Sequence, residues 1–268
     1  MSSKKIYYIN SANRIEGTDS DFSYCLSIPI HSNFTYCSVI QASIPKSYYL
    51  VQENQNTFTL DENGTEYTIT MPIGNYNRSS FIIKLQSLLN DIGSWTYVVT
   101  APDTSNGDPE TGKLTYSVSG NGGVQPKFIF TLYLYETMGF NKNSTVSFVG
   151  NSLTSSNVIN LQKESTLFIH SDLANNDTDN ILQDVYTEDS SDYGRIIYRN
   201  TDLEKNSKQI TTLDNVYRFY LTDENGLSIN LNGLSWQMTI ILYDDSQKRT
   251  NDMIQQYIKY KVVKDGNK

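Results

Sequence analysis

The side chains that most often do chemistry in proteins are few and scattered in this chain. Its two histidines, His31 and His170, stand far apart, and no Cys-x-x-Cys or His-Glu-x-x-His spacing accompanies either one. Zinc sites need such spacings. No Gly-x-Ser-x-Gly elbow or phosphate loop occurs, and the glycine-rich run at 120–123 lacks a following lysine and helix, which indicates a turn. We therefore predict no catalytic residue, no metal site and no cofactor.

Acidic and amide side chains offer two weaker signals. Five oxygen-bearing side chains lie within eight residues, at Asp172, Asn175, Asn176, Asp177 and Asp179. Calcium prefers such ligands, but the stretch lacks the glycine and distal glutamate of the helix-loop-helix calcium motif, which favours a solvated acidic loop. Glycosidases hold two carboxylates across one bond, and 29 acidic residues supply such pairs by chance. We expect the protein not to be an enzyme.

The two cysteines must be considered together with the cellular compartment in which the protein folds. Cys25 and Cys37 flank an expected turn near residues 31–32 and would face one another across a hairpin. The first residues are polar, and no apolar run approaches the roughly 20 residues that span a bilayer. We therefore expect synthesis in the cytosol, no membrane span, and two free thiols rather than a disulfide.

Charge is distributed unevenly along the chain. The net charge is −8, made up of +4 in residues 246–268 and −12 in the rest. An acidic body argues against general binding to nucleic acid or to anionic membranes. The basic tail is either solvated or in contact with an acidic neighbour or a polyanion such as a genome, and the sequence leaves these alternatives open.

The same tail has a loosely amphipathic pattern. Its apolar side chains include Met253, Ile254, Tyr257 and Ile258, interspersed with Lys and Gln. The segment is either a last element docked on its own domain or an arm that contacts a neighbouring subunit. These four residues are our candidates for such a contact.

Period-two alternation is the main structural signal. Phe22, Tyr24, Leu26 and Ile28 alternate with small or polar residues, as in a strand with one buried face. Further strands are expected across the chain, and Pro29 and Pro45 end two of them because proline has no N–H to donate. Twenty tyrosines fit the same β bias.

The sequence pattern of residues 58–140 predicts a compact α+β module. Asn63-Gly64 predicts a tight hairpin turn. Apolar residues from Phe81 to Ile92 recur at helical spacing, with Asn77, Ser79 or Ser80 as N-cap and Gly93 as the end. Three strands are expected after this helix.

Residues 141–245 return to strands. We expect a turn of helix near Ile181 in a long acidic loop, and a hairpin that joins strands at 217–221 and 227–231. Many short strands with long polar connections favour a jelly roll over a meander. The predicted fold is dominated by β structure: a single jelly-roll β-sandwich (1–57 plus 141–245) with an inserted small α+β subdomain (58–140) and a basic tail (246–268).

Several segments resemble the penton (vertex minor capsid) proteins of virophages and polinton-like DNA viruses. They occur in the family's order, and none is a sharp motif alone. They are NSANR at 10–14 followed by GT at 17–18 and DFS at 21–23, VIQASIPKSYY at 39–49, ITMPIGNYN at 69–77 before the helix, MGF at 138–140, and FYLTD at 219–223 through LNGLSW at 231–236. Residues 246–268 match nothing in the family pattern.

The resemblance implies a structural virion protein located at the capsid vertex and assembled in the host cell cytoplasm. It implies a homopentamer at the icosahedral five-fold vertices, surrounded by a double-jelly-roll major capsid protein, and an α+β module inserted between jelly-roll strands. The alternative is a β-sandwich that binds carbohydrate or attaches to a host, because the chain is rich in Tyr, Trp and Asn, although most of its aromatic residues follow the strand alternation.

Overall fold

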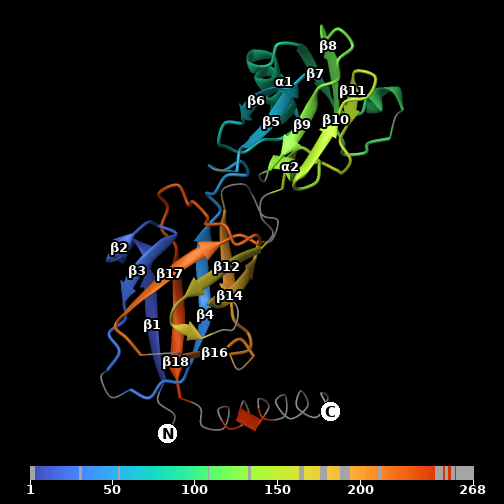
Figure 1. Ribbon diagram of the computed structural model, residues 1–268. Helices are drawn as coiled ribbons and strands as arrows, with labels where there is room; N and C mark the ends of the chain where they lie inside the picture. Colours follow the sequence, from blue (N-terminus) through green and yellow to red (C-terminus); the bar gives the residue numbers. More distant parts are fainter. Residues whose placement is uncertain are drawn as a thin grey trace, which may run out of the picture. The chain divides into compact units, whose positions relative to one another are not determined.

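Strands are the main regular secondary structure of the described chain (Figure 1). The computed structural model describes residues 4–29, 32–53, 55–107, 109–131, 134–162, 166–175, 180–187, 194–203, 205–210 and 213–244, together with Thr250, Met253, Ile254 and Tyr257. The chain forms two units, one comprising Met1–Tyr48 with Glu164–Lys268 and the other Tyr49–Lys163.

The second unit is wider at both ends than the module expected at 58–140. Val51 lies before that range, and Phe148 and Leu153 lie after it, yet all three pack in the core of the second unit. The flanking segments belong to this unit because their apolar side chains are covered there.

The first unit contains two antiparallel sheets. Sheet A has six strands: β1 (Lys4–Asn10), β18 (Gln237–Tyr243), β4 (Tyr36–Pro45), β15 (Arg195–Arg199), β16 (Lys208–Ile210) and β13 (Ala174–Asn175). Sheet B has five: β14 (Ile181–Tyr186), β12 (Thr166–Ser171), β17 (Val216–Thr222), β3 (Asp21–Cys25) and β2 (Glu16–Gly17). A 3-10 turn, η1 (Ser11–Asn13), follows β1.

The strand order is that of a jelly roll. Counted along the chain, the principal strands are β1, β3, β4, β12, β14, β15 with β16, β17 and β18. In these ordinal numbers, sheet A has the order 1-8-3-6 and sheet B the order 5-4-7-2, so successive principal strands alternate between the sheets except where β12 is followed by β14. This arrangement is the double Greek key of jelly-roll sandwiches, and the second unit is inserted between β4 and β12.

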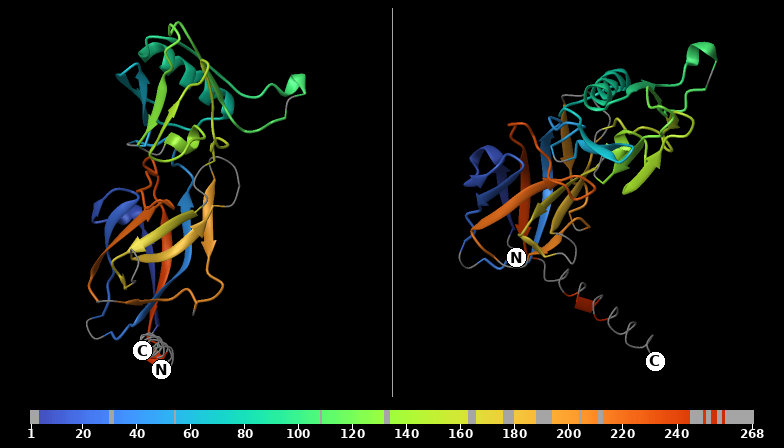
Figure 2. Two further views of the ribbon diagram at one scale, coloured as in Figure 1. Left: turned by 45° about the vertical axis from the view of Figure 1, so that its right-hand side comes forward. Right: turned by 45° about the horizontal axis from the view of Figure 1, so that its top comes forward.

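The two sheets face one another and bury one core. Figure 1 shows β12 and β17 in front of β1, β18 and β4, and the rotated views of Figure 2 keep the same two layers. Inward side chains such as Ile9, Phe22, Val39, Phe219 and Trp236 are at most 2% exposed. The predicted alternation at Phe22 is confirmed, because Phe22 contacts the rings of Phe219 and Trp236 across the core.

The second unit combines two small sheets with a helix. One sheet contains β10 (Ser144–Ser147), β9 (Lys127–Phe130), β5 (Thr57–Glu62) and β6 (Thr65–Thr70), and the other contains β11 (Ser152–Thr154), β8 (Thr115–Ser119) and β7 (Thr96–Thr100). The helices are α1 (Arg78–Ile92) and α2 (Leu134–Thr137), with a 3-10 turn, η2 (Thr104–Asn106). Strands and helices bury a core rich in aromatic side chains, which include Phe58, Tyr116 and Phe128.

Helix α1 confirms the predicted helix. Of the three candidate N-caps it uses Asn77, whose side chain accepts a hydrogen bond from the backbone N–H of Ser80. Phe81, Leu85 and Leu89 form its buried stripe, and Gly93 ends it. The predicted turn at Asn63-Gly64 is confirmed too, since both residues have positive φ and join β5 to β6.

Other sequence expectations were wrong. The segment at 181–186 is strand β14 rather than a turn of helix, because β12 pairs along it. Residues 227–231 form no strand. A single bridge, Thr222↔Ser228, joins them to β17, and their side chains Ile229 and Leu231 instead fill the sandwich core.

Candidate functional site

His170 has a structural environment. It is 5% exposed, its Nε2 lies 2.8 Å from Thr222 Oγ1, and its ring stacks on Tyr220 with 4.5 Å between ring centroids. A ring held between a hydroxyl and an aromatic face is oriented for packing between β12 and β17. His31 lies outside the described residues.

The acidic segment after β12 is described only in part, since Asn176, Asp177 and Asp179 lie outside the described residues. Asp172 uses its carboxylate to accept a hydrogen bond of 2.9 Å from the backbone N–H of Arg218. Burial raises the pKa of Asp172, against the opposing effect of that hydrogen bond. Within the described ranges, no three His, Cys, Asp or Glu side chains gather in a way that would hold a metal ion.

The two thiols do not face one another across a hairpin, so that expectation was wrong. Cys25 ends β3 in sheet B, and Cys37 lies in β4 of sheet A. Both are free; Cys25 is exposed and Cys37 is buried. Burial raises the pKa of the Cys37 thiol to about 12, which leaves it protonated and unreactive.

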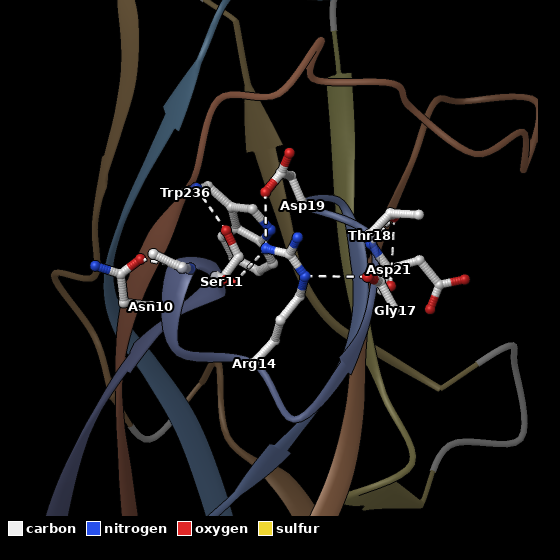
Figure 3. A network of polar contacts seen from close by, with 9 residues as sticks. Asn10, Ser11, Arg14, Gly17, Thr18, Asp19, Asp21 and Trp236 are labelled. Atoms are coloured by element: carbon white, nitrogen blue, oxygen red, sulfur yellow. Dashed lines mark hydrogen bonds and ion pairs between the residues drawn. The ribbon is translucent and has the colours of Figure 1, made fainter.

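The polar stretch at 10–21, which carries the first part of the family resemblance, forms a tight network (Figure 3). Asn10 accepts a hydrogen bond from the backbone N–H of Ala12 and caps η1. The backbone N–H of Ser11 donates to the carbonyl of Trp236 at 2.9 Å, and the Ser11 hydroxyl accepts from the Trp236 N–H at 3.0 Å. Ser11 is fully buried, so these bonds connect the end of β1 to the start of β18.

Arg14 closes the same network. Its guanidinium donates to the carbonyls of Ser11 and Gly17, each at 3.0 Å, and lies 2.9 Å from an Asp19 carboxylate oxygen. Gly17 has φ +95°, and a Cβ there would lie 2.3 Å from the carbonyl oxygen of Asp21, so only glycine fits. All these partners are internal, so these contacts form a structural clamp, whereas the Glu16 side chain of the same segment is exposed.

Two sheet faces have a different character. The outward side chains of sheet A, which we call the A face, include Ile6, Tyr8 and Ile197, at 48%, 75% and 57% exposure. Cross-strand pairing places Tyr8, Thr239, Gln41 and Arg199 in one row across β1, β18, β4 and β15. An antiparallel sheet that faces only water carries mainly polar side chains on that side.

The outward side chains of sheet B form the B face. Val216 and Tyr186 on this face are 45% and 69% exposed. Tyr220 lies between two partners, with the His170 ring on one side and the Arg218 guanidinium 4.5 Å from its ring centroid. Arg218 in turn donates two hydrogen bonds, of 2.7 and 2.6 Å, to the Asp21 carboxylate, which raises the pKa of Arg218.

The C-terminal candidates are exposed where they are described. Met253, Ile254 and Tyr257 have helical backbone and exposures of 64%, 52% and 60%. Ile258 lies outside the described residues. Their contact with a neighbour remains a prediction.

Our sequence reasoning missed both sheet faces. A signal was present in β1, where Ile6, Tyr7, Tyr8 and Ile9 form an unbroken apolar run. Such runs are typical of strands covered on both sides, and here only the inner side, with Tyr7 and Ile9, is covered by sheet B. The same pattern recurs in β15.

In the described part of the chain, no helix is both long and apolar enough to cross a membrane. No family model matches the sequence, and no curated protein matches it. Among solved structures, the chain is similar to the crystal structure of the mavirus penton protein with a TM-score of 0.43 and 12% identity, over 90% of this chain and 99% of that chain.

Proposed function

We propose that this protein is a structural subunit of a virus capsid, a penton-type minor capsid protein that assembles as a homopentamer at five-fold vertices. Its role is to form contacts rather than to catalyse a reaction. Its expected neighbours are further copies of itself and a double-jelly-roll major capsid protein, and its expected location is the capsid vertex of a virion assembled in the host cytoplasm.

One observation carries the proposal: the sandwich leaves large apolar side chains on the outer faces of both sheets. Tyr8 and Ile197 are more than half exposed on the A face, as is Tyr186 on the B face. A closed ring needs two different contact surfaces on each subunit, because each copy meets one neighbour on each side. A jelly roll with two such faces provides them.

The order of the sequence segments supports the same proposal. The segments similar to penton proteins fall on structural landmarks: the clamp after β1, the end of β4, the capped start of α1, and the turn from β17 towards β18. The insertion between β4 and β12 agrees with what the resemblance implies.

The C-terminal segment contributes a second contact in this proposal. We assign Met253, Ile254, Tyr257 and Ile258 to a neighbouring subunit because the three described side chains are more than half exposed. A truncation after residue 245 should weaken assembly without changing the stability of the sandwich. If the basic tail instead contacts the genome, the truncated protein will assemble normally and lose only its retention of nucleic acid.

Size-exclusion chromatography with light scattering tests the proposal directly. We expect a species of five times the 30.5 kDa chain mass, and rings in negative-stain micrographs. Tyr8→Asp should abolish this species, whereas Ile83→Asp, at a 67% exposed position on α1, should not. A wild-type protein that stays monomeric at high concentration, with no such protein at the vertices of purified particles, would refute the proposal.

A further inference from the structure

We infer that the A face of one copy binds the B face of the next copy, so that the two faces form the two halves of one head-to-tail contact. This rests on the proposed function and specifies which surfaces of the subunit build the ring. Three features support it: the charges of the two faces, the depression in the A face, and the need for the contacts to close into a ring.

The A face is basic. Lys4, Arg195 and Arg199 project outward from β1 and β15, as their cross-strand partners show. Arg195 is held by the Ser43 hydroxyl at 2.7 Å and by the carbonyls of Ser43 and Ser235. Among the described outward side chains of the sheet A strands, every ionised group is basic.

The B face is acidic. Glu16, Asp21 and Asp184 lie on it, since their cross-strand partners Ser23, Tyr220 and Phe168 point outward. Arg218 is the basic residue of this face, and Asp21 already neutralises it through two hydrogen bonds. Glu16 and Asp184 therefore leave a surplus of negative charge, opposite in sign to that of the A face.

The A face is also hollowed. A depression of about 610 Å³ is lined by residues that include Tyr8, Gln41, Ile197 and Arg199. Tyr8 and Ile197 stand at its two sides on β1 and β15, and polar side chains form its floor. The exposed aromatic side chain of Tyr186 belongs to the edge strand β14 and lines a second depression, of about 360 Å³, together with Ile197 and Arg199 of β15. Exposed aromatic side chains of this kind are enriched at protein interfaces.

Repulsion between like charges determines which two faces can bind one another. Two A faces brought together would oppose basic side chains, and two B faces would oppose acidic ones, which disfavours symmetric dimers. A face to B face is the combination in which opposite charges meet. That contact is heterologous, and repeated contacts of this kind close into a ring.

Charge reversal tests the pairing. Lys4→Glu with Arg199→Glu reverses the A face and spares Arg195, whose hydrogen bonds hold the sheet. Glu16→Lys with Asp184→Lys reverses the B face. Because like charges then meet, each double variant should raise the concentration needed for half-assembly by about 100-fold or more.

The decisive variant combines all four reversals in one chain. Its faces are again opposite in charge, so pentamers should return. A mixture of the two double variants should give species that alternate between them, such as heterodimers, but no pentamers, because a five-membered ring cannot alternate. Lys84→Glu with Lys113→Glu, both in the second unit, is the matched control and should assemble like wild type.

The outcomes separate this inference from the proposed function. Circular dichroism and thermal melting first establish that each variant is folded. If the wild type forms pentamers and both double variants do so equally well, the face assignment is wrong while the proposed function stands. If the double variants dissociate but the fourfold variant does not recover, opposite charge is not what pairs the faces and the inference is overturned. A monomeric wild type would remove the proposed function itself.

Discussion

The two units of this chain cover their sheets in different ways. In the second unit, helix α1 packs its stripe of Phe81, Leu85 and Leu89 into the same core as the strands. In the first unit the two sheets bury one core between them, and their outer faces carry exposed residues such as Tyr8 and Tyr186. In the second unit a helix thus covers strands, whereas each sheet of the first unit is covered on its inner face by the other sheet.

The largest expected effect tests whether the two cores are independent. Phe128 is fully buried in the second unit and lies 5.1 to 6.3 Å, between ring centroids, from five other aromatic rings. Phe128→Ala should destabilise this unit by about 3–5 kcal/mol, because it removes these contacts and leaves a cavity. Urea unfolding measures the loss.

The chain supplies its own reporters for that experiment. It has two tryptophans, Trp95 in the second unit and the buried Trp236 in the first. In a Trp95→Phe background, the fluorescence transition of Trp236 should not move when Phe128 is replaced. If the Trp236 transition instead shifts as far as the transition that Trp95 reports in the chain with both tryptophans, the two units unfold as one cooperative unit. Ile83→Ala, on the exposed side of α1, is the control.

A buried carboxylate contributes to the stability of the second unit. Glu62 is 4% exposed and accepts hydrogen bonds of 2.8 Å from both the Tyr97 hydroxyl and the Ser94 N–H. Glu62→Ala should cost about 2–3 kcal/mol, because it leaves two donors without a partner. Glu66→Ala, an exposed neighbour on β6, should cost little. Equal losses in thermal denaturation would show that this network contributes nothing to the second unit.

The clamp of the first unit provides a comparable test. Gly17→Ala forces an L-residue to positive φ and places a methyl group against the Asp21 carbonyl. We expect a loss of about 1–3 kcal/mol, read from the Trp236 transition. Gly64 also has positive φ, but nothing lies within 4 Å of its added Cβ, so Gly64→Ala should cost only about 1 kcal/mol. A Gly17 variant no worse than the Gly64 variant would contradict the role of the clamp.

The effect that is smallest at neutral pH is that of a buried thiol, because it develops only in alkaline solution. Burial raises the Cys37 pKa from 9.0 to about 12 in the folded protein, so the unfolded thiol ionises first. The contribution of Cys37 to stability is therefore complete below pH 9 and is lost as the pH rises towards 12, by at most about 1.4 kcal/mol per pH unit. Replacing Cys37 by Ala should flatten the alkaline fall in stability, whereas Cys25→Ala should leave it unchanged.

Local patterns were predictable from the sequence. Helix α1 and the β5–β6 hairpin follow from a buried stripe and an Asn-Gly turn, both of which lie within a few residues of the elements they specify. The sandwich as a class follows from alternation. The segment at 227–231 looked like a strand because its apolar residues alternate, yet Ile229 and Leu231 enter the core from a loop.

The candidate contact faces were harder to predict from the sequence. Which side chains share the A face depends on β18 lying between β1 and β4, and these strands are far apart in the sequence. Only the unbroken apolar run in β1 was a local sign. The clamp at 10–21 is the opposite case. Its residues stand out in the sequence because they carry part of the family resemblance, but the contacts they make stabilise the fold.

In the proposed assembly, the position of β18 determines when the A face can form. Because β18 is made last and lies between β1 and β4, a nascent chain still on the ribosome has no finished sheet A. The second unit, encoded in one continuous stretch, can fold long before that. In the proposed assembly, the A face is therefore complete only after β18 has been made.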